Sequence, residues 1–505
     1  MSKLEHQHEI ESKFRVDESF TWDGPRSLVP HRCSISQPQT FDMVAEYYDT
    51  EDLRLMCWGI TLRRREGGGD EGWHLKLPTD DEHGRIELRM PLSETLPVEF
   101  GDAVASIVRG DTLESLVTIR TTRTATLISD ASEPVLEFVD DLVTIEAADR
   151  PMLKPGITTF RELELELLDE AAAPMWRKAG EKLEKFGATR STVKKIVTAI
   201  ATDVALHPEF DHDLALSAKS SLRDVFLAYF NTHSRNLVLA DIGVRLGFDD
   251  AVHQMRVSAR RLRSALRLVE KYLETPWATS LEDELRWIAS ELGAARDVEV
   301  QHERLIAHAG ALPDDLRDPV VKSLDDYLAY RAQSAHGAML AAIRSDRYQY
   351  LIEDLISAVH DPHIIIRAQD SAKEVLSPDL RRIWKRLRKG FANIELDSPS
   401  EEWHDLRILA KRARYAINVF SPVTDLERLA EHMSLLTDVL GAHQDAHVSQ
   451  VLLRELAEHE TGFAGFGLGL LSAYERDNEL FARIRAFDLW RDIRKSAGKT
   501  KVFGS

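Results

Sequence analysis

The sequence predicts a multidomain protein in which an antiparallel all-β domain is followed by an all-α domain. Up to about residue 200, short segments alternate apolar and polar residues, which is the period of a strand with one buried face. From about residue 217, apolar residues recur with the 3.6-residue period of amphipathic helices. Two stretches of the second half match at a constant offset of 151 residues, which indicates an internal repeat.

The bulk composition narrows the class of protein. The 505 residues are enough for more than one domain, and 43% hydrophobic with 30% charged residues is typical of globular proteins. No apolar run reaches the length of a membrane span, and the N-terminus, MSKLEHQHEI, lacks the apolar core of a signal peptide. With Cys33 and Cys57 as the only cysteines, we expect reduced thiols and a cytoplasmic protein. A net charge of −19 argues against a polyanionic partner unless basic residues cluster locally.

We expect the β domain over residues 1–205, a linker over 206–216 and the helical domain over 217–500. Turn signals such as EGGGDEG separate the expected strands, which cover 59–66, 72–78, 85–91, 118–128, 135–145 and 160–169. One amphipathic helix is expected over 171–187, where Gly187 ends it. The two repeat units of the helical domain cover about 217–365 and 376–500.

Charged residues follow one face of nearly every expected strand. In HEIESKFRV, Glu9, Glu11 and Lys13 share a face, because successive side chains of a strand point to opposite sides. Other strands carry mainly one sign, with Arg63 and Arg65 on one and Glu162, Glu164 and Glu166 on another. A sheet with one solvated face is the common explanation. Alternatively, about eight strands permit closure into a barrel with a charged interior.

A charged interior needs compensation, because an unpaired buried charge is costly. Acidic and basic walls can neutralise each other. Alternatively, the basic wall binds phosphate oxygens while the acidic wall binds a hard cation such as Mg²⁺ or Mn²⁺.

The ordered series of motifs in the first domain resembles one known family. Glu9-x-Glu11-x-Lys13, YYDTEDLRL, GITLRRR, RIELR and ELELEL together resemble the CYTH, or triphosphate tunnel metalloenzyme, family over about residues 5–200. The resemblance implies an eight-stranded antiparallel β-barrel or tunnel with flanking helices, which binds triphosphate-containing substrates with Mg²⁺ or Mn²⁺.

The same resemblance assigns the site residues. It implies catalytic roles for Glu9, Glu11, Lys13, Glu162 and Glu164. It implies metal ligands at Glu9, Glu11, Asp140, Glu162 and Glu164. It implies substrate contacts from Lys13, Arg63, Arg65, Lys76, Glu87, Arg89, Arg123 and Lys194. Asp141 and Lys195 are adjacent alternatives to Asp140 and Lys194.

The helical domain carries a basic stripe twice. VHQMRVSARRLRSALRLV, from residue 252, matches WHDLRILAKRARYAINVF, from residue 403, and LGAARDVEV at 292 matches LGAHQDAHV at 440. A solvated helix face is the ordinary explanation of such a stripe, but like charges at this spacing repel one another. Their recurrence with a leading histidine favours an anion site. A helical metal site is disfavoured, because neither stripe has a second histidine at i+4.

These stretches resemble the CHAD, or conserved histidine α-helical, domain over about residues 217–495, which implies duplicated helical bundles that bind inorganic polyphosphate. The implied polyphosphate contacts are His253, Arg256, Arg260, Arg261, Arg263, Arg381, Arg382, Lys385, His404, Arg407, Lys411, Arg412 and Arg414.

The fusion of the two domains resembles bacterial inorganic triphosphatases. We therefore expect hydrolysis of inorganic triphosphate to pyrophosphate and phosphate in the first domain and binding of long-chain polyphosphate by the second. Polyphosphate granules are a candidate location within the cytoplasm. The alternatives are a non-catalytic polyphosphate-binding module, or a triphosphatase or cyclase acting on thiamine triphosphate or a nucleotide. Nucleic acid is disfavoured as a partner, because aromatic stacking residues are sparse among the basic helices.

Overall fold

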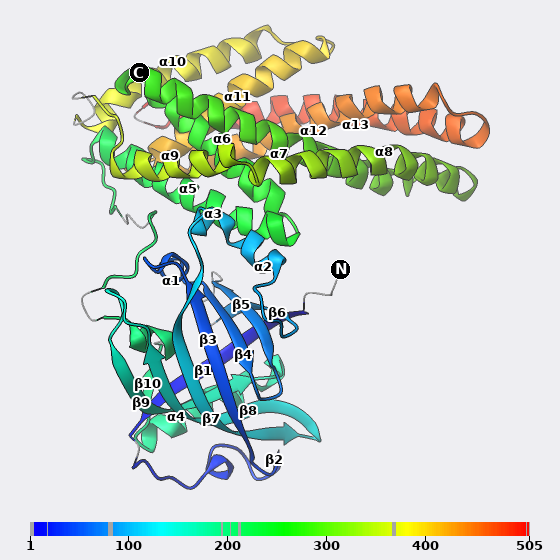
Figure 1. The fold of residues 1–505 in the computed structure, drawn as a ribbon. Helices are drawn as coiled ribbons and strands as arrows, with labels where there is room; N and C mark the ends of the chain where they lie inside the picture. The colour runs from blue at the N-terminus through cyan, green and yellow to red at the C-terminus, as the bar shows by residue number, and fades with distance from the viewer. Residues whose placement is uncertain are drawn as a thin grey trace. The chain divides into compact units, whose positions relative to one another are not determined.

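The computed structural model describes residues 5–17, 19–78, 84–192, 195–201, 204–210, 214–365, 370–500 and 502–503. The chain divides into two compact units, Met1–Pro208 and Glu209–Ser505. Figure 1 shows that the first is built around a curved sheet and the second from long helices. The predicted change from an antiparallel β domain to an all-α domain is therefore confirmed. In the part of the chain that the structure describes, no helix has both the length and the hydropathy needed to cross a membrane.

The sheet of the first unit closes on itself. Its eight long strands pair antiparallel in the order β1-β6-β5-β4-β3-β7-β8-β9, and β9 pairs with β1 to complete the ring. Two short strands pair at the margins, β2 with β7 and β10 with β1. The strands are β1 (Glu5–Val16), β2 (Ser34–Ile35), β3 (Gln39–Asp49), β4 (Thr61–Glu66), β5 (Gly72–Pro78), β6 (Gly84–Met90), β7 (Glu114–Asp130), β8 (Glu133–Ala147), β9 (Gly156–Leu167) and β10 (Thr189–Ser191).

Short helices flank this ring. They are α1 (Arg54–Cys57), α2 (Val98–Ala103), α3 (Ala105–Val108), α4 (Ala173–Lys185) and the 3₁₀ turns η1 (Pro25–Ser27), η2 (Glu170–Ala172) and η3 (Lys195–Ala199). The helix expected over 171–187 corresponds to η2 and α4, and Gly187 follows it at φ 104°, a value that favours glycine.

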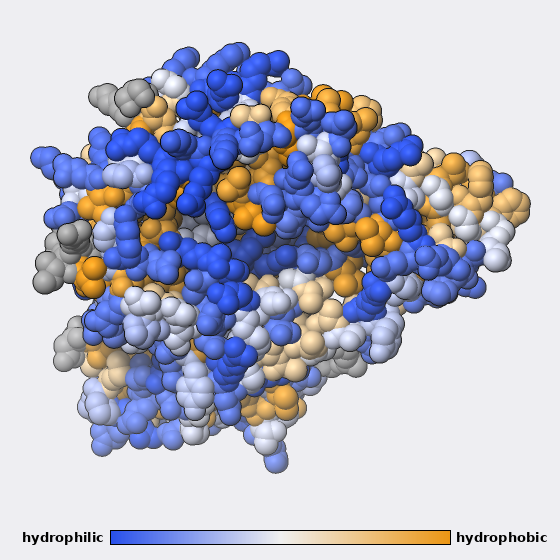
Figure 2. Space-filling view, turned by 90° about the horizontal axis from the view of Figure 1, so that it is seen from above, coloured by the Kyte–Doolittle hydropathy of each residue, from blue (hydrophilic) through white to orange (hydrophobic). Residues whose placement is uncertain are grey.

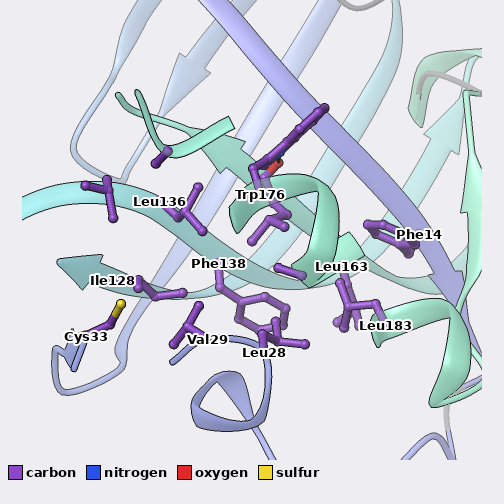
Figure 3. Packing of buried hydrophobic residues seen from close by; sticks show 14 of the residues in the cluster. Phe14, Leu28, Val29, Cys33, Ile128, Leu136, Phe138, Leu163, Trp176 and Leu183 are labelled. Atoms are coloured by element: carbon purple, nitrogen blue, oxygen red, sulfur yellow. Dashed lines mark hydrogen bonds between the residues drawn. The ribbon is translucent and has the colours of Figure 1, made fainter. Parts of the chain in front are cut away.

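The outer face of the ring is covered where α4 lies on it. Phe14 of β1, Phe138 of β8 and Leu163 of β9 are buried with Leu183 of α4 in one apolar cluster. Figure 3 shows side chains from these strands and from α4 gathering on one side of the sheet. Trp176 also donates its indole N–H to the Leu165 carbonyl at 2.8 Å. Because the neighbours of Phe14 and Leu163 along their strands have the opposite parity, Lys13, Glu162 and Glu164 face the interior.

One end of the interior is filled by a second apolar cluster. Ala45 and Tyr47 of β3, Ile119 of β7 and Ile145 of β8 are buried there with Ile196 of η3. The rest of the interior remains open and polar, so the ring provides a chamber whose charged walls are supported on rigid strands.

The second unit consists of nine helices over residues 222–365 and 370–497, and consecutive helices pack against each other within two series, α5 to α9 and α10 to α13. They are α5 (Leu222–Leu246), α6 (Ala251–Val269), α7 (Thr275–Ala309), α8 (Asp314–Ile343), α9 (Asp346–His360), α10 (Ala372–Asn393), α11 (Ser400–Phe420), α12 (Glu427–Ala457) and α13 (Gly462–Ala497). The 3₁₀ turns η4 (Glu270–Tyr272) and η6 (Ser421–Val423) follow α6 and α11.

The predicted duplication is visible in this order, because α5–α8 correspond to α10–α13. Equivalent helices also meet, α6 against α11 and α8 against α13. Buried polar contacts connect the two halves, including the Arg304 guanidinium, which donates to Glu475 at 2.7 Å, and Ser449, which donates to Gln301 at 2.8 Å. On the face drawn in Figure 2, hydrophilic residues predominate and hydrophobic residues form separate patches.

Candidate functional site

A cavity of about 450 Å³ lies inside the closed sheet, and charged side chains supply much of its lining. Its walls come from β1, β3–β9 and η3, and alternate side chains of each strand point inward. The basic residues at its surface are Lys13, Arg63, Arg65, Lys76, Arg89, Arg123 and Lys195. The acidic residues are Glu11, Asp70, Glu137, Glu164 and Glu166. The cavity therefore brings together most of the residues that the sequence predicted for a triphosphate site.

Glu87 of β6 anchors the basic wall formed by β4, β5 and β6. Its carboxylate is fully buried and lies 3.4 Å from an Arg63 nitrogen, 3.3 Å from Lys76 Nζ and 2.6 Å from an Arg89 nitrogen. Sequence reasoning placed Glu87 in contact with substrate. The structure instead places it behind the three cations, where it neutralises and orients them.

His74 links this wall to the turn after β4. Its Nε2 donates to the Asp70 carbonyl at 2.8 Å, because a carbonyl oxygen can only accept. Its Nδ1 lies 2.9 Å from the Glu87 carboxylate, so a further proton resides between these two groups. The buried His74–Glu87 pair therefore holds the turn in place through a hydrogen-bonded chain.

A second cluster joins β1, β7, β8, β9 and η3. Arg123 donates to Asp141 at 2.8 and 2.9 Å and to Glu164 at 2.7 Å. Lys195 Nζ lies 2.5 Å from Asp141 and 2.9 Å from Glu164. Lys13 Nζ lies 3.0 Å from Glu11 and 3.4 Å from Glu164. The acidic and basic side chains of this cluster thus neutralise each other, and Lys13, Arg123 and Lys195 also line the cavity.

Two sequence assignments are revised by this geometry. The Asp140 carboxylate receives hydrogen bonds from Arg161 at 2.6 and 2.8 Å, on the face of β8 opposite the cavity. Asp141, with no exposed side-chain surface, occupies the interior position instead. Lys194 lies outside the described residues, and Lys195 is the lysine whose ammonium group reaches the acidic cluster. We therefore replace Asp140 by Asp141 and assign Lys195 to the site.

Electrostatics hold these groups in defined charge states. Burial opposes ionisation of Glu164, but Lys195, Lys13 and Arg123 outweigh it and keep its pKa well below the usual range. Burial likewise opposes protonation of Lys13, yet Glu11 and Glu164 raise its pKa. Burial and the adjacent Arg63 lower the pKa of Arg65 to about 10, which leaves it protonated at neutral pH. The walls therefore present fixed charges of both signs.

Glu162 differs from the other carboxylates. It is completely buried, and within the described residues no donor makes a hydrogen bond to either of its carboxylate oxygens. Lys195 Nζ at 3.6 Å and Arg15 Nε at 3.4 Å are its nearest cationic partners. Burial raises the pKa of Glu162 to about 7. An orphaned buried carboxylate has unused capacity to accept a cation or a donor from a ligand.

The acidic residues fit a hard divalent cation by their chemistry, because Mg²⁺ and Mn²⁺ prefer carboxylate oxygens. Glu162 offers two unused oxygens, and Glu11 and Glu164 face the adjacent cavity. Lysine side chains now lie between these acids, and no group of three His, Cys, Asp or Glu residues within the described ranges converges closely enough to hold an ion. The backbone of Glu9 pairs with Arg85 in the sheet, but the Glu9 side chain lies outside the described part of the structure.

A second basic cluster lies where α6 meets α11 in the helical unit. Arg256 and Arg260 of α6 interact electrostatically with Arg407 and Lys411 of α11, so the two predicted stripes form one surface. The Nε atoms of Arg260 and Arg407 are buried, and no described residue accepts a hydrogen bond from them. Unsatisfied guanidinium donors among like charges are typical of a site that an anion completes.

The charge of Lys411 is the most strongly perturbed in this cluster. Burial and the neighbouring guanidinium groups of Arg407, Arg260 and Arg256 lower its pKa to about 7. Asp445 opposes this shift but is itself partly buried. The ammonium group is therefore only partly protonated near neutral pH until an anion compensates the cluster.

The other predicted polyphosphate residues have varied surroundings. Arg263 pairs with Glu282 at 3.3 Å, Arg414 donates to Thr437 at 2.7 Å, and His404 Nδ1 lies 2.7 Å from the Gln444 oxygen. His253 and Arg261 are partly buried on α6. The exposed residues are Arg381, Arg382 and Lys385 of α10 and Arg412 of α11.

Sequence reasoning missed several residues of both sites. Tyr47 lines the cavity, and its hydroxyl accepts a hydrogen bond from Arg63 at 3.3 Å; it lies in the YYDTEDLRL motif. Asp70 belongs to the glycine-rich turn that served only as a strand boundary. In the helical unit, Asp297 pairs with Arg256 at 2.6 Å, and Asp445 is its repeat equivalent. The aspartate that ends both LGAARD and LGAHQD is the sequence feature that could have predicted an acidic residue beside each basic stripe.

Comparison with known proteins agrees with both resemblances. A family model described as the CYTH domain matches residues 7–192, and a model described as the CHAD domain matches residues 228–454. Uncharacterized proteins from two strains of Mycobacterium tuberculosis, CDC 1551 and H37Rv, are each 31% identical over 501 residues, covering 94% of both chains.

Solved structures give weaker likenesses. The CHAD domain from the plant Ricinus communis is 28% identical, with a TM-score of 0.45, and covers 56% of this chain and 94% of its own. A putative adenylyl cyclase from Hippeastrum, whose title reports a dominant triphosphatase activity, is 15% identical, with a TM-score of 0.24, and covers 38% of this chain and 94% of its own.

Proposed function

Because this chain belongs to the family of proteins that join a CYTH domain to a CHAD domain, we propose that it is a metal-dependent inorganic triphosphatase that also binds polyphosphate. Members of the CYTH family typically act on triphosphates and generally depend on divalent metal. The reaction that we propose is hydrolysis of inorganic triphosphate to pyrophosphate and phosphate.

The observation that carries the proposal is the composition of the cavity. Four cations of the basic wall, Arg63, Arg65, Lys76 and Arg89, together with Arg123 of β7, surround one chamber that also contains a carboxylate cluster. The Nε atoms of Arg63 and Arg65 are buried, and no described group accepts a hydrogen bond from them. A linear triphosphate supplies several anionic oxygens for these donors, and arginine suits phosphate because its donors lie in a rigid plane.

Hydrolysis requires in-line attack of water on a terminal phosphorus, with the pyrophosphate oxygen as leaving group. The basic wall holds the chain of phosphates extended and neutralises the charge that develops on the leaving group. Glu11, Glu162 and Glu164, with Glu9, are the residues that would hold a divalent ion. When bound, that ion would supply Lewis-acid stabilisation of the phosphate oxygens.

Lys195 and Lys13 help to keep Glu164 ionised, because their charges lower its pKa against the effect of burial. Both ammonium groups contact Glu164, and Lys195 also contacts Asp141. By neutralising these acids they reduce repulsion between the carboxylates and an incoming polyanion. Asp141 in turn positions Arg123, which donates to it through two nitrogens.

Phosphate release decides among the substrates. The full-length protein is incubated with inorganic triphosphate, thiamine triphosphate, ATP and long-chain polyphosphate, each with Mg²⁺ and with Mn²⁺. We expect the highest kcat/KM for inorganic triphosphate. Faster turnover of thiamine triphosphate or ATP would identify a different substrate, and a lack of turnover on the whole panel would favour a non-catalytic binding module.

For the helical unit, we propose one composite polyphosphate site on the surface where α6 and α11 meet. The mutual repulsion of Arg256, Arg260, Arg407 and Lys411 costs free energy unless an anion offsets it. A flexible polyphosphate chain satisfies all four groups with successive phosphates. Binding of this kind weakens steeply as salt rises, because it releases counterions.

A further inference from the structure

The turn between β4 and β5 places an acidic residue inside the basic cavity. Residues 67–71, GGGDE, connect these strands, and Gly68, Gly69 and Asp70 line the chamber. Asp70 forms an ion pair with Arg65, and its carbonyl accepts the hydrogen bond from His74. Its carboxylate therefore occupies space beside the guanidinium groups that a phosphate would use.

The conformation of this turn is built into the sequence. Gly67 and Gly68 have φ values of 80° and 83°, which residues other than glycine rarely adopt. A Cβ at Gly67 would lie 2.3 Å from the Asp42 carbonyl oxygen of β3, so a larger residue would push the turn away. The glycines thus let the turn pass close to β3 and direct Asp70 inward.

The charges around the Asp70 carboxylate show that it lies beside the arginines of the basic wall. Burial opposes ionisation of Asp70, but Arg65, Arg63, His74 and Arg89 outweigh it and lower its pKa. It remains only partly exposed, with 28% of its side-chain surface accessible. An ionised acid is thus held where the proposed substrate carries its own negative charge.

We infer that Asp70 is an internal competitor of the substrate, a tethered carboxylate that occupies the Arg65 phosphate position until a triphosphate displaces it. This inference rests on the proposed triphosphatase function. When a phosphate binds at Arg65, it replaces the Asp70–Arg65 ion pair with its own ion pair to Arg65. Breaking the first pair offsets part of the binding free energy of any phosphate at this position. Asp70 also favours release of the products, because pyrophosphate and phosphate make fewer contacts than triphosphate and are displaced from Arg65 more easily.

The test compares the full-length protein with Asp70→Asn, which removes the charge and preserves the shape. Its matched control is Glu71→Gln, which removes the same charge from the exposed neighbouring position of the turn. We expect Asp70→Asn to lower KM for inorganic triphosphate by about tenfold and to strengthen inhibition by pyrophosphate similarly, while Glu71→Gln changes both by less than about twofold. A KM that is unchanged or raised by Asp70→Asn would overturn the inference.

A double-mutant cycle identifies Arg65 as the group in competition. In an Arg65→Gln background, Asp70→Asn should no longer lower KM; a gain that persists would show a general charge effect and refute the mechanism. Calorimetric titration of metal-free triphosphate onto the same variants gives a measure that is independent of turnover. Tighter metal-free binding by Asp70→Asn, with no phosphate release from triphosphate when Mg²⁺ or Mn²⁺ is supplied, would support the competition and contradict the triphosphatase. If neither the wild type nor the variant bound triphosphate without metal or hydrolysed it with metal, both proposals would fail.

Discussion

Arg123 of β7 donates to Glu164 of β9 at 2.7 Å, and this contact connects the two strands that flank β8. The same guanidinium is held by Asp141 of β8 through two further hydrogen bonds. A residue that would neutralise phosphate is thus positioned by two acids, and its orientation depends on both.

The two aspartates of FVDDL should differ sharply in importance. Asp141→Asn removes the charge that fixes Arg123 and Lys195, so we expect kcat/KM for triphosphate to fall at least about 100-fold. Asp140→Asn is the matched control, because that residue contacts Arg161 on the other face of β8. We expect it to remain within about threefold of wild type. Steady-state phosphate release measures both, and equal losses would contradict the revised assignment.

Glu11 should set the metal requirement. We expect Glu11→Gln to lower turnover by about 100-fold at limiting Mn²⁺ and to weaken Mn²⁺ binding, because it removes one anionic oxygen donor. Calorimetric titration of Mn²⁺ gives the binding change without relying on activity. Glu133→Gln, at an exposed position of β8, is a control for loss of one negative charge. Wild-type Mn²⁺ affinity in Glu11→Gln would exclude Glu11 from the metal site.

Charge reversal should reveal one shared polyphosphate site. Arg256→Glu with Arg260→Glu, or Arg407→Glu with Lys411→Glu, should each weaken binding of long-chain polyphosphate by at least about tenfold. Because the four groups form one cluster, the quadruple variant should lose less than the sum of the two effects in free energy. Arg476→Glu with Arg485→Glu, at exposed positions of α13, introduces the same change in charge as a control. Strict additivity would indicate two separate sites.

The lowered pKa of Lys411 predicts a pH dependence. Its value of about 7 means that the folded, ligand-free protein loses this charge as pH rises through neutrality. Polyphosphate binding favours the protonated form, so affinity should fall between pH 6 and pH 8.5. Lys411→Arg keeps the charge over this range and should flatten that fall. Titrations of both proteins at matched ionic strength separate this effect from ionisation of the polyphosphate, which is common to both.

The alternation of charge put Lys13, Arg63, Arg65, Lys76 and Arg89 on the polar faces of their strands. The family resemblance, which also contributed Arg123, implied that these faces line an interior, and all six side chains line the cavity. Alternation alone left open whether the faces meet solvent or an interior. It failed at FVDDL, because β8 is apolar on both faces. Phe138 packs outward under α4, whereas Val143 and Ile145 fill the interior near η3. Because the sequence does not reveal that inner apolar cluster, it could not decide which of Asp140 and Asp141 faces the interior.

The sequence did not identify Asp70 as a cavity residue, for a different reason. The sequence shows a flexible, glycine-rich connection, and only the contacts with β3 and His74 turn its acidic residue inward. In the helical unit, the repeat predicted two equivalent stripes. Their union at one surface depends on the packing of α6 against α11, which the spacing of residues along each helix does not specify.

Closure of the ring by β1 and β9 has a consequence for biosynthesis. The register joins Ile10 to Leu167 and Val16 to Arg161, so the first strand made must wait for one of the last in its unit. Contacts this distant along the chain slow folding, because a long loop loses entropy before any pairing stabilises it. During translation, β1 therefore emerges as an unpaired, alternating strand that other chains could join. Its charges at Glu9, Glu11, Lys13 and Arg15 would then discourage aggregation long before they could serve any ligand.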